Sequence, residues 1–391
     1  MSPVSPLVAS ARQSAQRAPI SGIITAVNYG RDRDGLIPLW AGEGDLPTPR
    51  FISDAAAAAL VGGETFYTHQ RGIPDLRQAL ADYYGRHFPG AYDPDTFFIT
   101  CSGMQAIQIS IALTAGDGDE ILIPSPSWPN AAGAAVIAGA QPVTVPFDEE
   151  GGVFNLNMDR LAAAVTPRTK ALFLNSPANP TGWTASQDKL VEVLAFARQH
   201  GLWIIADEIY SRFYWLDGPR APSFLDIADP EDRILYVNTF SKNWAMTGWR
   251  MGWIHAPLPL KQTLENLIQY STSGVAQFMQ RAGTVALDDG EWFVEHTIAR
   301  ARRGRQVVSD ALAGHNRITY APPDGAFYAF LKVDGLASSQ AATFSLIDDA
   351  NVGTAPGTAF GAEGEGFVRI CFARSEASLS EAMERILQIL R

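Results

Sequence analysis

The segment ILYVNTFSKNWAMTGWRMGWIH, residues 234–255, holds two apolar strand-like runs with a lysine between them. The first run, ILYVNT (234–239), leads into the polar stretch that carries Lys242, and the second, RMGWIH (250–255), follows about ten residues later. A crossover between parallel strands needs a dozen or more residues, usually as a helix. The short connection therefore predicts that one of these two strands runs antiparallel.

Five more apolar, β-branched runs precede this segment from about residue 95 onward. Helix-like stretches, such as 104–114 and 187–200, separate them. Fully apolar strands that alternate with helices are typical of a parallel sheet covered on both faces. We therefore predict an α/β fold in which a mostly parallel seven-stranded sheet lies between helices. The five runs are TFFIT (96–100), EILIP (120–124), QPVTVP (141–146), KALFLN (170–175) and LWIIA (202–206).

The pattern changes after Gln269, where helical stretches continue to about Leu312 and a mixed α+β region follows. We predict an N-terminal arm at residues 1–49, irregular and in part joined to the small domain, then a large domain at 50–285 and a small C-terminal domain at 286–391. The small domain is expected to contain GAFYAFLKV (325–333), VGTAP (352–356), FVRICFA (367–373) and a final helix at 379–390.

The composition limits the class of protein. A chain of 391 residues with 47% hydrophobic and 18% charged residues suits a globular protein of two domains. Its net charge of −11 argues against a nucleic-acid partner. No apolar run approaches the roughly 20 residues that span a membrane, and the six histidines are scattered without metal-site spacing. The two cysteines, Cys101 and Cys371, lie in apolar runs, which indicates reduced thiols and a cytoplasmic location.

Lys242 is the most informative residue, because a lysine that leaves an apolar strand is removed from the open solvent that it prefers. Ligands of doubly wound sheets bind beyond the carboxyl ends of the strands, so Lys242 lies at the ligand end. Desolvation lowers the pKa of a lysine and makes its amine a nucleophile towards an aldehyde. An imine on Lys242 is the expected chemistry.

Other strand ends carry polar or glycine residues, each of which has a common structural explanation when taken alone. Ser102 and Gly103 precede a helix that opens at Met104, and free N–H groups there suit a phosphate, although many such turns need glycine only to bend. Asp207 and Tyr210 follow LWIIA, where an acidic residue is most often a cap. Asn179 lies in SPANPTG (176–182), a segment that is most often only a turn.

Together these residues have one consistent use. Asp207 would pair with a pyridinium nitrogen and keep it protonated, while Lys242 holds the ring as an imine. Tyr210 and Asn179 would hydrogen-bond the ring's phenolate oxygen, and Trp128 would stack on the ring. The phosphate would be held by Ser102, Gly103 and Arg250.

This constellation resembles the class I/II (fold type I) pyridoxal-phosphate-dependent aminotransferases over nearly the whole chain. The lysine segment fits the attachment pattern of that family from Phe240 to Gly252. Further matching stretches are AGEGDLPTP (41–49), YTHQRGIPDLR (67–77), SPANPTG, ADEIY (206–210), SKNWAMTGWRMG (241–252), GAFYAF (325–330) and VRICFA (368–373).

The resemblance implies further roles. Arg369 is similar to the arginine that grips the substrate α-carboxylate, helped by Asn179 and the backbone at Gly42. Tyr67 is similar to the tyrosine that reaches the phosphate of the neighbouring subunit's cofactor, which implies a homodimer with shared active sites. The phosphate would also meet the hydroxyls of Thr239, where the family usually has Ser, and Ser241, and the backbone N–H of Met104. Gly44 stands where the family usually has Pro, which puts the rigidity of the arm in doubt.

The implied activity moves an amino group between an α-amino acid and a 2-oxo acid by a ping-pong mechanism through a Lys242 internal aldimine. Lys242, once released, would move a proton from Cα to C4′ of pyridoxal 5′-phosphate. The apolar arm residues Ile20, Ile23 and Ile24, with no arginine placed for a second carboxylate, favour neutral or aromatic substrates.

Two alternatives stay open on the residues alone. The first is a carbon–sulfur β-lyase, which this fold type also hosts and which no residue excludes. The second is a ligand-binding regulator on the same body. Such a regulator usually needs an appended DNA-binding domain, for which there is no room before Pro49, and the acidic charge argues against it.

Overall fold

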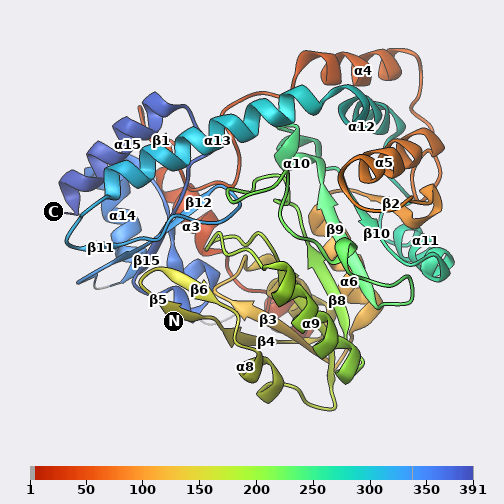
Figure 1. The fold of residues 1–391 in the computed structure, drawn as a ribbon, viewed down its shortest axis with the longest axis horizontal. Helices are drawn as coiled ribbons and strands as arrows, with labels where there is room; N and C mark the ends of the chain where they lie inside the picture. The colour runs from red at the N-terminus through yellow and green to blue at the C-terminus, as the bar shows by residue number, and fades with distance from the viewer. Residues whose placement is uncertain (1–4, 337, 391) are drawn as a thin grey trace.

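The computed structural model describes residues 5–336 and 338–390. Its central element is a seven-stranded sheet in the order β2-β10-β9-β8-β7-β3-β4 (Figure 1). All seven predicted runs form these strands. Their bounds are β2 (Phe97–Thr100), β3 (Glu120–Ser125), β4 (Gln141–Pro146), β7 (Thr169–Asn175), β8 (Trp203–Asp207), β9 (Ile234–Thr239) and β10 (Gly252–His255).

The predicted reversal is confirmed at β10. This strand pairs antiparallel with both of its neighbours, so that Gly252 lies opposite Thr239 of β9 and Thr100 of β2. The pairs β3–β4, β3–β7, β7–β8 and β8–β9 are parallel. The reversal brings the start of β10 beside the ends of β9 and β2, which is where the predicted site residues lie.

Both faces of this sheet are buried, as the fully apolar strands predict. Successive side chains of a strand point to opposite faces. Accordingly, Leu172 and Ile204 belong to one apolar cluster, whereas Ala171 and Ile205 belong to the other. The predicted covering helices are present as α6 (Gly103–Thr114) and α9 (Gln187–His200).

A second, four-stranded sheet with the order β11-β12-β15-β14 confirms the α+β region (Figure 1). Its strands are β11 (Ile318–Thr319), β12 (Tyr328–Val333), β14 (Ala355–Pro356) and β15 (Phe367–Cys371). The long helix α13 (Glu291–Leu312) runs from the α10–α12 side of the molecule across to α15 (Glu376–Ile389). The domain limits at residues 49 and 285 stay a prediction.

The remaining elements connect and cover these two sheets. They are α1 (Pro6–Ala9), α2 (Gln13–Gln16), α4 (Arg50–Val61), α5 (Pro74–His87), α7 (Asn130–Ala138), α8 (Met158–Ala163), α10 (Phe240–Asn243), α11 (Lys261–Gln269), α12 (Gln277–Asp289), α14 (Ser339–Asp349), β5 (Asp148–Glu150), β6 (Val153–Asn155), β13 (Val352–Gly353) and six short 3₁₀ turns, η1 (Pro94–Thr96) to η6 (Ala362–Gly364).

The expectation of an irregular arm is wrong for residues 22–38. A helix, α3 (Gly22–Gly30), forms there because Ser21 accepts a hydrogen bond from the Ile24 amide and so caps the first turn. Strand β1 (Ile37–Pro38) pairs with β13, which joins the arm to the C-terminal part of the chain. Neither element was predicted, because the Pro and Gly residues around them are typical of loops.

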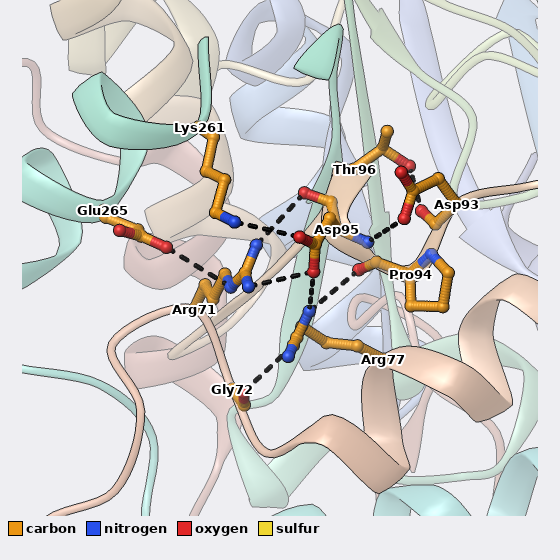
Figure 2. A network of polar contacts seen from close by, with 9 residues as sticks. All are labelled: Arg71, Gly72, Arg77, Asp93, Pro94, Asp95, Thr96, Lys261 and Glu265. Atoms are coloured by element: carbon orange, nitrogen blue, oxygen red, sulfur yellow. Dashed lines mark hydrogen bonds and ion pairs between the residues drawn. The ribbon is translucent and has the colours of Figure 1, made fainter. Parts of the chain in front are cut away.

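A polar network fixes the base of the loop between α4 and α5, which carries Tyr67 (Figure 2). The Asp95 carboxylate forms ion pairs with Arg71 at 2.9 Å, Arg77 at 2.7 Å and Lys261 at 2.9 Å. Glu265 of α11 pairs with Arg71 at 3.3 Å. Three cations around one carboxylate hold the pKa of Asp95 well below its usual range, with the Lys261 hydrogen bond as the largest cause.

Candidate active site

A cavity of about 500 Å³ opens at the carboxyl ends of the parallel strands. It reaches from the α3 side to the N-terminus of α6 and includes residues of the second sheet. Most of the predicted site residues line it: Gly42, Gly103, Met104, Trp128, Asn179, Asp207, Tyr210, Thr239, Ser241, Lys242, Arg250 and Arg369.

Two predicted residues do not line this cavity. Ser102 is buried, and its hydroxyl caps α6 by accepting a hydrogen bond from the Gln105 amide. Tyr67 is 94% exposed, so it points away from the cavity of its own chain. The exposure is what a residue that serves another subunit requires.

Lys242 lies in α10, immediately after β9, and is partly buried. Its amine donates a hydrogen bond to the Gly42 carbonyl across 2.6 Å. Burial lowers the pKa of Lys242 to about 8, which leaves about a tenth of the amine uncharged at pH 7, far more than for an ordinary lysine. The amine is thus held in the cavity by the backbone of the arm and is basic enough to accept a proton.

Asp207 is the last residue of β8 and is 1% exposed. Its carboxylate accepts a 3.4 Å hydrogen bond from the Ile209 amide, and the structure gives it no cation within ion-pair distance among the described residues. Burial raises its pKa to about 7. A carboxyl buried without a cation lacks the partner that a protonated ring nitrogen would provide.

The opposite end of the cavity is built for an anion. The amides of Gly103 and Met104 open helix α6, and neither has a hydrogen-bond acceptor among the described residues. The Thr239 and Ser241 hydroxyls lie 3.0 Å apart, and Arg250 lines the same cavity. The Thr239 hydroxyl donates to the Met251 carbonyl across 2.9 Å, so the available donors are the helix N–H groups, the Ser241 hydroxyl and one guanidinium, a set that suits a phosphate.

The backbone at this end is strained. Ser102 has φ of 98° and Arg250 has φ of 52°, both in the region that non-glycine residues avoid. Gly252 has no room for a side chain, because a Cβ there would lie 2.6 Å from the Gly103 amide nitrogen and 2.8 Å from the Ser102 carbonyl carbon. The start of α6 therefore packs directly on the backbone of β10, a role of Gly252 that the sequence did not reveal.

Arg369 of β15 reaches the cavity from the second sheet and is 1% exposed. One terminal nitrogen donates to Oδ1 of Asn179 across 2.9 Å, and the other donates to the Trp40 carbonyl. Its Nε is buried and has no hydrogen-bond partner among the described residues. A guanidinium held this rigidly, with donor capacity to spare, suits a carboxylate ligand.

Two aromatic residues that the sequence analysis left without a role enclose Arg369. Its Cζ lies 4.5 Å from the centre of the Tyr328 ring and 4.8 Å from that of Phe360. The Tyr328 hydroxyl also forms a 2.7 Å hydrogen bond with the Tyr210 hydroxyl. The motif GAFYAF contains Tyr328, but only the tertiary structure brings it between these two groups.

The wall formed by α3 is apolar. Ile23, Ile24 and Val27 line the cavity from this helix, and Trp40 lines it from the following segment. The cations that line the cavity are Lys242, Arg250 and Arg369. Of the arm residues expected here, Ile20 is 91% exposed and lines a different cavity.

The donor set as a whole fits pyridoxal phosphate. A phosphate site and a buried carboxyl lie in the same cavity as an amine, an aromatic side chain (Trp128) and a carboxylate-binding arginine. Among residues 5–336 and 338–390 there is no cluster of side chains suited to a metal ion, and no helix in the same ranges is long and apolar enough to cross a membrane.

Comparisons with known proteins agree with this geometry. The sequence pattern of the family described as aminotransferase class I and II matches residues 35–386. The chain is 38% identical to an aromatic-amino-acid aminotransferase 2 of Thermococcus litoralis, over 92% of each chain. It is 37% identical to an aspartate aminotransferase of Pyrococcus abyssi, over 91% of this chain and 92% of that protein.

Solved structures give the same result. The fold is similar to the crystal structure of an aromatic aminotransferase from Pyrococcus horikoshii, with a TM-score of 0.86 and 35% identity. The match covers 94% of this chain and 98% of that one.

Proposed function

The chain belongs to the class I and II aminotransferases and is a pyridoxal-phosphate-dependent aminotransferase, and from this premise we propose how its residues perform the reaction. The observation that carries the proposal is the cavity in which Lys242, Asp207 and Arg369 converge from α10, β8 and β15. When bound, pyridoxal phosphate supplies the carbonyl group that captures the amino group and a ring that accepts electrons from the substrate.

Lys242 attaches the cofactor and then moves the proton at the substrate Cα. Its pKa of about 8 makes the amine both a nucleophile and a base near neutral pH. The Gly42 carbonyl accepts its hydrogen bond at 2.6 Å and keeps the amine at the cavity wall. Lys242 thus can take the proton from one carbon and return it to another without leaving the cavity.

Asp207 holds the proton on the ring nitrogen. The carboxyl is buried and has no cationic partner among the described residues, so a protonated nitrogen would be the partner that relieves its desolvation. Tyr210 and Asn179 would hydrogen-bond the ring oxygen, and Trp128 would cover the ring.

The phosphate is held at the α6 end of the cavity. The Gly103 and Met104 amides, the Ser241 hydroxyl and Arg250 would supply the contacts there, with the Thr239 hydroxyl beside them, while Ser102 fixes the helix cap. Tyr67 acts in a second copy of the chain, so we propose a homodimer with shared sites. Its 94% exposure, next to Phe66 at 81%, supports this, because neighbouring exposed aromatic side chains are typical of a protein–protein interface.

Arg369 binds the α-carboxylate of the amino acid or 2-oxo acid, with Asn179 and the Gly42 backbone beside it. The carboxylate would meet the free Nε and share the terminal nitrogens that now bond to Asn179 and Trp40. A guanidinium that is already rigid loses little conformational entropy when it binds a carboxylate.

The substrate side chain is apolar, and an aromatic amino acid fits best. Ile23, Ile24 and Val27 form the wall, and each cavity cation already has a role. The Thermococcus litoralis relative is named for aromatic amino acids, whereas the Pyrococcus abyssi relative is named for aspartate. The two free cysteines, Cys101 and Cys371, support a cytoplasmic location.

The test is a screen of purified, cofactor-loaded protein against phenylalanine, tyrosine, leucine, alanine, aspartate and glutamate, with 2-oxoglutarate or pyruvate as acceptor. We expect aromatic donors to have the highest kcat/KM. A preference for aspartate would contradict the apolar side-chain site, and release of pyruvate and thiol from cystathionine without amino transfer would favour the β-lyase.

A further inference from the structure

We propose that Tyr328 is a positioning residue with two separable functions: its ring holds the carboxylate-binding Arg369, and its hydroxyl strengthens the hydrogen bond that Tyr210 gives to the cofactor. The inference rests on the proposed function, since it uses the roles assigned there to Arg369 and Tyr210. Nothing in the sequence pattern gave Tyr328 a role, and the argument comes from its contacts.

The Tyr210 and Tyr328 hydroxyls form a buried hydrogen-bonded pair. The oxygens of Tyr210 and Tyr328 lie 2.7 Å apart, and the two residues are 2% and 0% exposed. Burial raises the pKa of both phenols, so each keeps its proton. A neutral phenol has one O–H to donate and lone pairs that accept. If Tyr210 gives its hydrogen to the ring oxygen of the cofactor, then Tyr328 is the donor within the pair.

This direction has a consequence for the strength of the Tyr210 bond. A hydroxyl that accepts one hydrogen bond becomes a better donor in the next, because chains of hydrogen bonds polarise one another. The effect is larger in a buried site than in water. Tyr210 therefore draws more negative charge from the ring oxygen while the Tyr328 hydroxyl is present, and the nitrogen that links the cofactor to Lys242 loses proton affinity.

The ring contact concerns the substrate end of the cavity. The Arg369 Cζ lies 4.5 Å from the centre of the Tyr328 ring and 4.8 Å from the centre of the Phe360 ring, close enough for cation–π attraction to each. The pair of rings fixes the plane of the fork. Phe360 makes this contact without any hydroxyl, so it serves as a natural control.

Tyr328 also restricts the size of the side chain at position 42, in the arm segment beside the cavity. A Cβ on Gly42 would lie 2.1 Å from the Tyr328 hydroxyl oxygen, so any larger residue there would displace the Tyr328 ring. The carbonyl of Gly42 accepts from Lys242, and that of Trp40 accepts from Arg369. One tyrosine thus contacts the arm, the arginine and the ring-oxygen tyrosine.

The experiment separates the two functions with Tyr328→Phe, Tyr328→Leu and Phe360→Leu in the cofactor-loaded protein. The first measurement is the absorbance of the lysine-linked cofactor against pH without substrate. The second is the dissociation constant of 3-phenylpropanoate, a carboxylate that cannot react because it has no amino group. Neither measurement is an activity.

We expect Tyr328→Phe to raise the pKa of the nitrogen that links the cofactor to Lys242, followed by absorbance, by about half a unit. The affinity for 3-phenylpropanoate should stay within about twofold of the wild type. Phe360→Leu should have the opposite pattern. It should lower the affinity for 3-phenylpropanoate roughly tenfold and leave the pKa of the lysine-linked cofactor unchanged. Tyr328→Leu should show both effects. Because that variant loses a fully buried ring, the other two decide the question if it does not fold.

An unchanged titration in Tyr328→Phe, or an equal shift in Phe360→Leu, would overturn the inference while the proposed function stands. A wild-type protein that carries no cofactor on Lys242 would overturn both. The two failures are therefore distinguishable in the same set of titrations.

Discussion

Arg369 donates a hydrogen bond to Asn179 across 2.9 Å, and this contact joins the two sheets inside the cavity. Arg369 belongs to β15, whereas Asn179 follows β7 of the seven-stranded sheet. The Asn179 amide in turn donates to Asn175, whose side chain donates to the Asp207 carbonyl at 3.0 Å. The group proposed to bind the substrate carboxylate is therefore connected through two asparagines to the strand end that carries Asp207.

Replacement of Arg369 should affect substrates far more than the cofactor. Loss of one partner from a buried charged pair costs about 3–5 kcal/mol, or roughly 10²- to 10⁴-fold in kcat/KM. Arg369→Lys should recover little, because a point charge cannot reproduce the fork. Steady-state kinetics of both half-reactions beside a cofactor titration provide the measurement. If KM for every carboxylate substrate stays at the wild-type value, Arg369 does not bind the carboxylate.

Lys242→Ala should remove the covalent attachment of the cofactor and the activity with it. No other lysine lines the cavity, so no second amine among the described residues can take its place. Borohydride reduction of the loaded wild-type protein followed by peptide mapping should label the peptide that contains Lys242. Label on a different lysine would show that the site is assigned wrongly.

The seven-stranded sheet and its one reversed strand followed from local features. Short apolar runs identify buried strands, and the ten-residue connection after β9 leaves no room for a crossover helix. The positions of Lys242, Asp207 and Asn179 followed from the rule that ligands bind at strand ends. These predictions depended on residues close to one another in the chain.

What the sequence did not reveal depends on long-range packing. Tyr328 and Phe360 enclose Arg369 only because β12, η5 (Gly357–Phe360) and β15 pack together. Helix α3 was missed because its nine residues lie between Pro- and Gly-rich stretches that are typical of loops. Gly252 is required by the approach of α6, which no local pattern encodes.

Tyr67 and Lys242 variants should complement each other if active sites are shared. Tyr67→Ala and Lys242→Ala proteins should each have low activity, and a refolded mixture should regain a part of it, because some dimers then contain one intact site. Asp207→Ala mixed with Lys242→Ala is the matched control and should regain none, since both residues line the same cavity. Sedimentation as a monomer at assay concentration would contradict the shared site.

Asp207→Asn should lower turnover by about 10²- to 10³-fold, because the ring nitrogen loses the anion that keeps it protonated. The control is Glu208→Gln. Burial also raises the pKa of Glu208 to about 7, but its carboxylate bonds to Ser223 instead of lining the cavity. Turnover of Glu208→Gln should therefore stay within a few-fold of the wild type. Equal losses in both variants would remove the assigned role of Asp207.

The same residue gives a pH dependence whose direction follows from its raised pKa. The pKa of Asp207 is about 7 in the cofactor-free fold and 3.8 ordinarily, so the folded chain keeps a proton that the unfolded chain releases. Stability from this group is complete below pH 4 and is lost as the pH rises to about 7, a decline of up to about 4 kcal/mol. At pH 8 the cofactor-free Asp207→Asn protein should thus unfold at a higher temperature than the wild type, whereas at pH 4 the two should be similar.

The bound cofactor would provide a cation for Asp207, so loading should stabilise the wild type at pH 8 more than it stabilises Asp207→Asn. Thermal unfolding of both proteins, loaded and free, at the two pH values provides the measurement, and a cofactor-free variant less stable than the wild type at pH 8 would show that Asp207 is not an uncompensated buried carboxylate.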